Sequence, residues 1–160
     1  MTIAPGQSLL HYRLVEKIGE GGMGVVWKAV DTSLDREVAI KFLPEALAGE
    51  AERLARFERE AQAVAALSHT NILAIHDFGT AEGITYAVME LLDGKTLRSK
   101  LDEGTLTTAK AVDYAIEITR GLAAAHDKGI THRDLKPENV FVTQGGHIKI
   151  LDFGLAKVER

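Results

Sequence analysis

The sequence contains no cysteine, and this absence excludes disulfide bonds, thiolate metal sites and cysteine nucleophiles. A chain without cysteine also fits a reducing compartment, so we expect a cytoplasmic location, with a membrane anchor outside these residues left open. No apolar run approaches the length of a membrane span, and residues 1–8 lack the basic region and the apolar stretch of a signal peptide. We therefore expect no membrane segment in these residues.

An excess of positive charge is also missing. Lys and Arg total 19, Asp and Glu total 23, and the formal net charge is −4. Such a mildly acidic chain is a poor candidate for non-specific nucleic-acid binding, so we expect no nucleic-acid partner. The hydrophobic share of 46 % and the charged share of 26 % are typical of a soluble globular protein, and they exclude collagen-like and disordered classes. The 160 residues have the size of one ordinary domain.

The first 90 or so residues are predicted to be mostly β-strand with one helix. Apolar residues three and four positions apart predict a helix over 50–67. Segments rich in β-branched and aromatic residues, bounded by turn signals, predict strands over 12–18, 25–30, 37–43, 71–78 and 84–91.

The rest of the chain is predicted to be helical first, followed by a small hairpin. Thr107 is a plausible N-cap for a long helix over 108–127. Short strands are expected at 140–142 and 147–151. The change in composition at Asp93-Gly94 indicates two lobes with a hinge, and the fold class is α+β.

A glycine-rich turn separates the first two predicted strands. The segment Gly19-Glu-Gly21-Gly-Met-Gly24-Val-Val26 matches the pattern G-x-G-x-x-G-x-V. Dinucleotide-binding folds share this spacing, but they need a helix after the glycines, whereas Val25-Val26-Trp27 predicts a strand. A glycine-rich hairpin can lie over a polyphosphate, because backbone without side chains approaches the anion closely. From this segment alone, a flexible hairpin without a ligand stays open as the alternative.

A lysine and a glutamate each lie among apolar residues. Side chains alternate along the strand over 37–43, so Ala39 and Lys41 share one face. Glu60 lies on the apolar stripe of the predicted helix, where an unpaired carboxylate is costly. We expect an ion pair between Lys41 and Glu60 that directs the ammonium at a phosphate. The alternative is that both side chains reach water at the rim of the fold. We would favour this alternative if the two residues were considered without the glycine-rich turn.

A dense run of charged residues follows the long helix. His132-Arg-Asp134-Leu-Lys136-Pro-Glu-Asn139 offers a base, a cation and a neutral oxygen ligand within a few residues. Asp152-Phe-Gly154 follows an apolar strand, and a carboxylate at such a strand end is well placed to hold Mg²⁺, which prefers oxygen ligands and substrate phosphates. Each piece alone can be a plain turn or loop, but a plain turn does not explain why all of them occur together and in this order.

Together these segments resemble the eukaryotic-type (Hanks-type) serine/threonine protein kinase family, in its bacterial style. The glycine-rich loop, Val38-Ala-Ile-Lys41, Glu60, the run from His132 to Asn139, and Asp152-Phe-Gly154 occur in the family's order. The resemblance covers residues 12–157. It implies a bilobal protein-kinase-like fold, with an antiparallel five-stranded N-lobe that holds one main helix, and a mainly helical C-lobe.

For the nucleotide, the resemblance implies that the glycine-rich loop covers the phosphates of ATP. Lys41, held by Glu60, would contact the α- and β-phosphates. Met89 resembles the gatekeeper residue of the family. The full set of further nucleotide contacts that the resemblance implies is Ile18, Gly19, Glu20, Gly21, Gly22, Met23, Gly24, Val26, Ala39, Met89, Glu90 and Leu92.

For the chemistry, the resemblance implies a role for four further residues. Asp134 would accept the proton of the substrate hydroxyl, and Lys136 would stabilise the transferred phosphoryl group. Asn139 and Asp152 would hold Mg²⁺. The lysine at position 136 resembles the serine/threonine branch of the family, because tyrosine-specific members usually lack a lysine at that point.

The family's pattern continues beyond what this sequence contains. Only six residues follow Gly154, and the activation segment and the Ala-Pro-Glu motif are absent. We therefore expect an incomplete kinase domain that is inactive alone, and that exposes apolar surface from the helix over 108–127 and from the strands over 140–151. The expected division is an N-terminal extension at 1–11, an N-lobe at 12–89, a hinge at 90–95 and an incomplete C-lobe at 96–160.

The function that the resemblance implies is transfer of the γ-phosphoryl group of MgATP to a serine or threonine hydroxyl of a protein substrate. The alternative is a pseudokinase that serves as a nucleotide-binding or scaffold module. Pseudokinases commonly lose the lysine or one of the two aspartates, whereas Lys41, Asp134 and Asp152 are all present, so the enzyme is favoured. A small-molecule kinase of similar fold is disfavoured by Lys136 and the complete run to Asn139.

Overall fold

A computed structural model of the chain describes residues 3–21, 24–43, 51–151 and 153. The chain folds as two compact units. The first unit combines Met1–Arg59 with Ile75–Leu91, and the second combines Glu60–Ala74 with Leu92–Arg160. Strands form most of the first unit, whereas the second combines helices with a small sheet.

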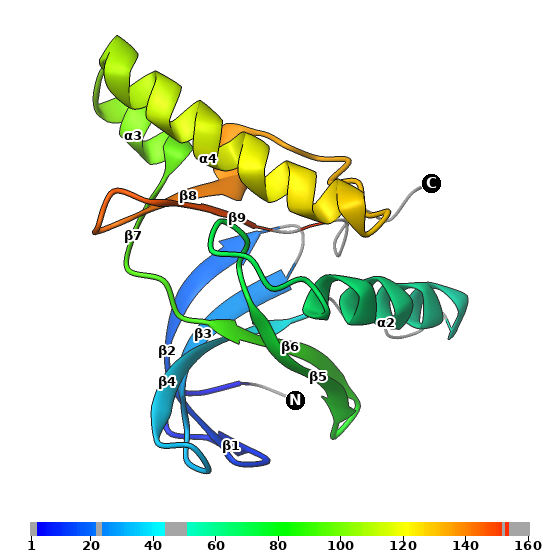
Figure 1. Ribbon diagram of the computed structural model, residues 1–160. Coiled ribbons are helices and arrows are strands. Elements are labelled where there is room, and N and C mark those ends of the chain that lie inside the picture. Colours follow the sequence, from blue (N-terminus) through cyan, green and yellow to red (C-terminus); the bar gives the residue numbers. More distant parts are fainter. Residues whose placement is uncertain (1–2, 22–23, 44–50, 152, 154–160) are drawn as a thin grey trace. The chain divides into compact units, whose positions relative to one another are not determined.

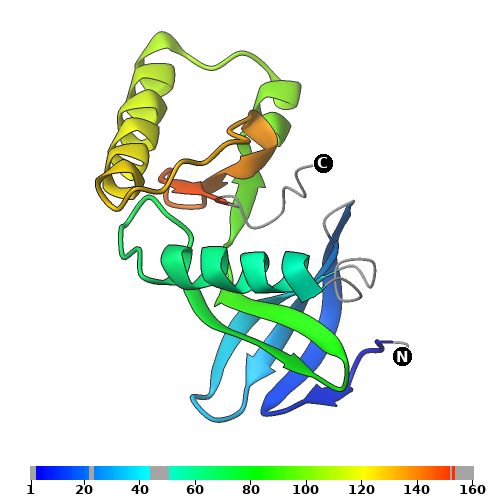
Figure 2. The same cartoon turned by 90° about the vertical axis from the view of Figure 1, so that its right-hand side faces the viewer.

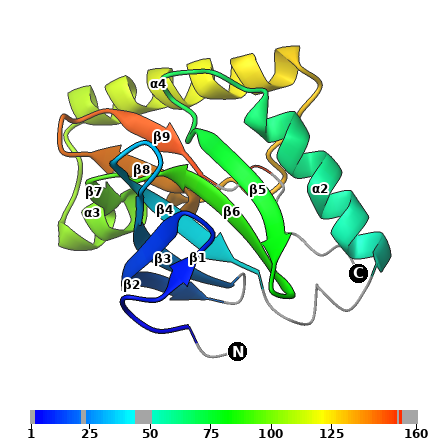
Figure 3. The ribbon, with the colours of Figure 1, turned by 90° about the horizontal axis from the view of Figure 1, so that it is seen from below.

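The first unit is built on a curled antiparallel sheet with the strand order β1-β2-β3-β4-β6-β5 (Figures 1 and 3). Its strands are β1 (Ser8–Leu9), β2 (Tyr12–Gly21), β3 (Gly24–Asp31), β4 (Arg36–Phe42), β5 (Ile75–Ala81) and β6 (Ile84–Glu90). The sheet has one strand more than the five expected from the sequence, because Leu9 pairs with Tyr12 and adds β1 to the edge. A two-residue strand is too short to show an alternating pattern, so the sequence does not predict it.

One face of this sheet forms the core of the first unit. Trp27, Ile40 and Val88 lie opposite one another on three neighbouring strands and are at most 6 % exposed. The hydroxyl of the buried Tyr12 donates a hydrogen bond of 2.9 Å to Asp77 Oδ2, so this buried polar group has its partner. The remaining buried members of the core are Leu9, Leu14, Ala29, Val38, Phe42 and Tyr86.

The helix α2 (Ala51–Ala65) lies within the range predicted for it. Ala61 and Val64 are buried, as the apolar stripe predicts. The next strand begins later than predicted, because β5 starts at Ile75 and not at Asn71. The preceding residues bond to β9 (Ile148–Ile150) of the second unit's sheet instead.

The second unit contains a three-stranded antiparallel sheet in the order β7-β8-β9, with β7 at Gly94–Thr96 and β8 at Val140–Thr143. The predicted hairpin of β8 and β9 is present, and β7 is an addition that pairs Lys95 with Val142. Gly94 has a φ of +145°, and a Cβ placed there would lie 2.1 Å from the Val142 carbonyl oxygen. Only glycine fits such a close approach of two strands.

Two helices of the second unit follow β7 in the chain. They are α3 (Leu97–Glu103), which the sequence pattern did not predict, and α4 (Thr108–Asp127), which has the predicted bounds. Thr107 caps α4 as predicted, since its hydroxyl oxygen accepts a hydrogen bond of 3.2 Å from the Lys110 N–H. The long helix α4 runs along the small sheet and packs against β9 (Figure 2).

The expectation of exposed apolar surface is confirmed for α4 and wrong for the strands. Val112 is 51 % exposed and Ile116 is 44 % exposed on α4. The apolar side chains of β8 and β9 are at most 2 % exposed at Val140, Val142, Ile148 and Ile150. These four side chains are buried in the second unit, where α4 packs against β9, whereas Phe141 of β8 is partly buried.

Candidate active site

Four of the predicted nucleotide contacts share one face of the first unit's sheet. Val26 lies opposite Lys41, and Ala39 lies opposite Met89. Directly opposite residues of an antiparallel pair point to the same face, and so do residues two apart on one strand. All four side chains therefore lie on the face opposite the Trp27 core. Lys41 is only 9 % exposed, so this face buries one lysine among apolar side chains. Lys28, opposite Ala39, is a second lysine on this face and forms an ion pair with Glu37.

The glycine-rich hairpin joins β2 to β3, where Gly21 pairs with Gly24. Gly24 has a φ of +115°, and a Cβ there would lie 2.0 Å from the carbonyl oxygen of Phe42. The backbone of β3 thus approaches β4 so closely that position 24 requires glycine. The predicted contacts Gly22 and Met23 lie outside the described residues.

The predicted contacts that precede the hairpin lie on β2. Gly19 pairs with Val26, and Ile18 is 47 % exposed. The exposed carboxylate of Glu20 accepts a hydrogen bond of 2.8 Å from Lys17 Nζ, and this bond holds the pKa of Glu20 below its ordinary value. The side chains of Ile18 and Glu20, next to the hairpin, are therefore exposed to solvent.

The remaining predicted residues divide between described and undescribed parts of the chain. Glu90 ends β6 and is partly buried, and Leu92 follows it in the second unit. Glu60 lies in α2, but its side chain is outside what the structure describes, so the ion pair with Lys41 stays a prediction. Asp152 also lies outside the described residues, directly after Leu151.

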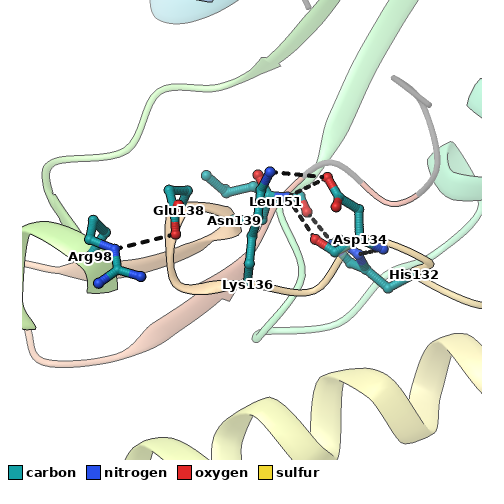
Figure 4. A network of polar contacts seen from close by, with 7 residues as sticks. All are labelled: Arg98, His132, Asp134, Lys136, Glu138, Asn139 and Leu151. Atoms are coloured by element: carbon teal, nitrogen blue, oxygen red, sulfur yellow. Dashed lines mark hydrogen bonds and ion pairs between the residues drawn. The ribbon is translucent and has the colours of Figure 1, made fainter. Parts of the chain in front are cut away.

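The second unit brings two predicted catalytic residues, Asp134 and Lys136, and the predicted metal ligand Asn139 together in one loop (Figure 4). Asn139 Nδ2 donates a hydrogen bond of 2.9 Å to the carbonyl oxygen of Asp134 and one of 3.3 Å to its carboxylate Oδ2. Lys136 Nζ lies 3.5 Å from the same Oδ2. The 3₁₀ helix η1 (Pro137–Asn139) turns the chain so that Lys136 and Asn139 both face Asp134. A carboxylate, a cation and an amide thus lie within hydrogen-bond or ion-pair distance.

His132 fixes this loop to the strand that follows it. Its Nδ1 accepts a hydrogen bond of 3.1 Å from the Asp134 N–H, so the ring proton is on Nε2. Nε2 then donates a hydrogen bond of 2.6 Å to the Leu151 carbonyl oxygen. The ring is 2 % exposed, and its centroid lies 4.7 Å from that of Phe153. One buried imidazole therefore holds both Asp134 and Leu151, the residue that follows β9.

Two features of this loop are not predicted by the sequence patterns. Arg133 has a φ of +69°, a left-handed conformation that is uncommon for a non-glycine residue and that often occurs at functional sites. Arg98 of α3 forms an ion pair of 3.4 Å with Glu138 of η1 (Figure 4). Neither feature has a local sequence signal, because both depend on the folded backbone of the loop.

Comparison with known proteins identifies the family. Residues 12–160 match the family model described as protein kinase domain. The chain belongs to the protein kinase family. A probable serine/threonine-protein kinase of Clostridium acetobutylicum is 44 % identical over 148 residues, which cover 92 % of this chain and 22 % of that protein. The serine/threonine-protein kinase PknA of Mycobacterium tuberculosis is 44 % identical over 153 residues, which cover 92 % of this chain and 36 % of that protein.

Solved structures of the family confirm the expected protein-kinase-like fold. The crystal structure of the PknI kinase domain of Mycobacterium tuberculosis superimposes with a TM-score of 0.88 at 30 % identity, and the match covers 98 % of this chain and 64 % of that one. The chain thus spans 22 % to 36 % of the length of the curated relatives named above. Within the described ranges, no helix is long and apolar enough to cross a membrane.

Protein kinases in general use ATP and Mg²⁺, and the loop of Asp134 and Asn139 offers oxygen atoms of the kind that bind this metal. Mg²⁺ prefers a few carboxylate or amide oxygens combined with phosphate oxygens. Asn139 is 8 % exposed, and its amide nitrogen is engaged by Asp134, so the amide oxygen is the atom that it can offer to a cation. The hydrogen bonds that hold the amide also fix the direction of that oxygen.

Proposed function

We propose that the full-length protein is a protein kinase that transfers the γ-phosphoryl group of ATP to serine or threonine hydroxyls of protein substrates. The observation that carries the proposal is the bonded group of Asp134, Lys136 and Asn139 in a chain of the protein kinase family. The lysine at position 136 supports serine and threonine as the acceptors, by resemblance to that branch of the family.

Asp134 is the proposed base. Its side chain is 35 % exposed, so a substrate hydroxyl can reach the carboxylate. The Asn139 amide fixes the orientation of this carboxylate, which a proton acceptor needs. In the proposed step, the hydroxyl proton moves to the Asp134 carboxylate while the hydroxyl oxygen attacks the γ-phosphorus of ATP. The bond from that phosphorus to the β,γ-bridging oxygen breaks, and ADP leaves.

Lys136 is the proposed source of positive charge at the transferred group. Its ammonium is 3.5 Å from Asp134 Oδ2, which supports a position near the point where the substrate oxygen would meet the phosphoryl group. Negative charge on the phosphoryl oxygens in the transition state is stabilised by a cation that is already in place.

When bound, MgATP supplies the reactive phosphoryl group and the divalent charge that neutralises its oxygens. We assign Asn139 and Asp152 to the metal, and Lys41, held by Glu60, to the α- and β-phosphates. The glycine-rich hairpin would cover the phosphates. The other nucleotide contacts stay as proposed from the sequence, and the shared face of Val26, Ala39, Lys41 and Met89 supports them.

The proposal also includes the organisation of the chain. Residues 12–89 would form the nucleotide-binding lobe, 90–95 the hinge, and 96–160 the part of the second lobe that carries the catalytic loop. The absence of cysteine and the proposed use of ATP support a cytoplasmic location of this part of the protein.

The test is phosphoryl transfer from ATP labelled at the γ-phosphate, with the full-length protein and a protein substrate. We expect label on serine or threonine. The variant Asp134→Asn should bind MgATP with unchanged Kd but transfer phosphate about a hundredfold or more slowly, because it lacks the base. MgATP binding without any transfer by the wild-type protein would indicate a nucleotide-binding scaffold instead.

A further inference from the structure

Asn71 is a buried polar residue outside the motifs named above. It is 2 % exposed and lies just before β5, in the stretch of the second unit that ends at Ala74. Burying an amide side chain is costly unless its polar atoms form hydrogen bonds. The partners of Asn71 therefore indicate what this residue holds in place.

Asn71 extends the small sheet on the open side of β9. Its carbonyl oxygen accepts a hydrogen bond of 2.8 Å from the Ile150 N–H, and the Leu73 N–H donates one of 3.0 Å to the Ile150 carbonyl oxygen. The side-chain nitrogen of Asn71 donates a further hydrogen bond of 2.9 Å to the Ile148 carbonyl oxygen. Main chain and side chain of one residue thus hold both ends of β9.

Glu117 of α4 holds the Asn71 side chain in this position. Its Oε1 accepts a hydrogen bond of 3.1 Å from Asn71 Nδ2 and also lies 3.1 Å from His147 Nδ1. Gly121, one turn further along α4, allows the close approach, because a Cβ there would be 3.2 Å from the Asn71 carbonyl oxygen and 2.8 Å from Ile150 Cδ1. The amide of Asn71 is thus fixed between a helix and a strand.

The strand that Asn71 holds leads directly to the catalytic loop. Leu151 follows β9, and its N–H donates a hydrogen bond of 2.9 Å to the Asn139 carbonyl oxygen. Its carbonyl oxygen accepts the hydrogen bond of 2.6 Å from His132 Nε2 (Figure 4). A shift of β9 along its own axis would therefore displace both His132 and Asn139, which in turn bond to Asp134.

We propose that Asn71, anchored by Glu117, is a positioning residue that sets the register of β9 and, through Leu151, the geometry of the catalytic loop. It touches no reacting atom in this account. The inference rests on the proposed kinase function. Placement errors of about 1 Å at a reacting group can reduce a rate by about a hundredfold, so a remote residue can carry such an effect.

The test measures two properties of the full-length protein and its variants. The first is kcat and KM for MgATP, and the second is the rate of amide hydrogen exchange at residues 148–151. We expect Asn71→Ala to lower kcat about tenfold or more while KM for MgATP stays within about twofold. Hydrogen exchange at Ile150 and Leu151 should become faster in the same variant. Glu117→Ala, which keeps Asn71, should show the same changes to a smaller extent and provides the test if Asn71→Ala does not fold.

Two matched variants separate positioning from general loss of structure. Glu117→Gln keeps an acceptor oxygen for Asn71 and should retain most of the wild-type kcat. Asp113→Ala removes an exposed carboxylate from the same helix, one turn earlier, and should change neither kcat nor exchange. Folded Asn71→Ala or Glu117→Ala protein with wild-type kcat overturns the positioning role. A wild-type protein that transfers no phosphate overturns the proposed function itself, which distinguishes the two failures.

Discussion

The close approach of β3 and β4 at the glycine-rich hairpin predicts that Gly24→Ala is strongly destabilising. The substitution adds a single methyl group at a φ of +115°, 2.0 Å from the backbone oxygen of Phe42. The left-handed conformation alone costs a non-glycine residue about 1–3 kcal/mol. Because the obstacle is backbone and not a flexible side chain, β3 must also move away from β4, which weakens at least one hydrogen bond of about 1 kcal/mol. The expected loss is about 3 kcal/mol or more.

A second glycine provides the matched control. Gly83 lies in the β5–β6 turn of the same unit with a φ of +78°, and a Cβ there would meet nothing within 4 Å. Gly83→Ala should therefore cost only the conformational term, about 1–2 kcal/mol. The difference between the free energies of unfolding of the two variants therefore measures the cost of the steric clash between β3 and β4.

Urea unfolding followed by the fluorescence of Trp27 measures both free energies. Trp27 is the only tryptophan of this sequence, lies on β3 near Gly24, and is 6 % exposed in the core of the first unit. A Gly24→Ala protein whose free energy of unfolding is within about 0.5 kcal/mol of the Gly83→Ala value would show that the close approach of β3 to β4 does not make position 24 sensitive. A gap of about 1 kcal/mol or more would support it.

Two further predictions concern local interactions in the two units. Thr107→Ala should lower the free energy of unfolding by about 1 kcal/mol, because the N-cap hydrogen bond to Lys110 is lost, whereas Thr108→Ala, one residue further along, should change it little in the same urea titration. Burial and then the hydrogen bond to Asp77 raise the pKa of Tyr12 above its ordinary value of 10.0, so its contribution to stability is complete below about pH 10 and falls as the pH rises further, because the unfolded chain ionises first. Tyr12→Phe should lower the free energy of unfolding by about 1–2 kcal/mol near pH 7, and this variant should lose less stability above pH 10 than the wild type does. If the urea midpoints of the variant and the wild type fall equally steeply with pH above pH 10, Tyr12 does not cause the loss.

The elements that sequence predicted best are those with strong local signals. The helix α4 begins directly after the capping residue Thr107 and has the predicted bounds, because a cap and an apolar period are both local properties. The strand β7 was missed because three residues, including Gly94, become a strand only by pairing with β8. The sequence does not predict the helix α3, because its seven residues contain only two apolar members, Leu97 and Leu101, which is too short a run to establish a period.

In the candidate site, too, local features are predicted from the sequence and features that depend on the fold are not. The alternation along β4 predicts that Ala39 and Lys41 share a face, and the strand register agrees. The order of residues in the loop predicts Asp134 and Asn139 as neighbours, but their hydrogen bond depends on the turn that η1 makes. The role that we assign to Asn71 could not be predicted, because its partners are 46 and 77 residues away along the chain.

We propose that the loop around Asp134 performs phosphoryl transfer. The most direct measurement is the kcat of full-length Asp134→Asn at saturating MgATP, beside the same change of residue type at an exposed position of α4, Asp113→Asn. We predict that Asp134→Asn lowers kcat about a hundredfold or more, because the loop loses its proton acceptor, while Asp113→Asn stays within about twofold of the wild type. Similar kcat values for Asp134→Asn and the wild type would contradict the claim.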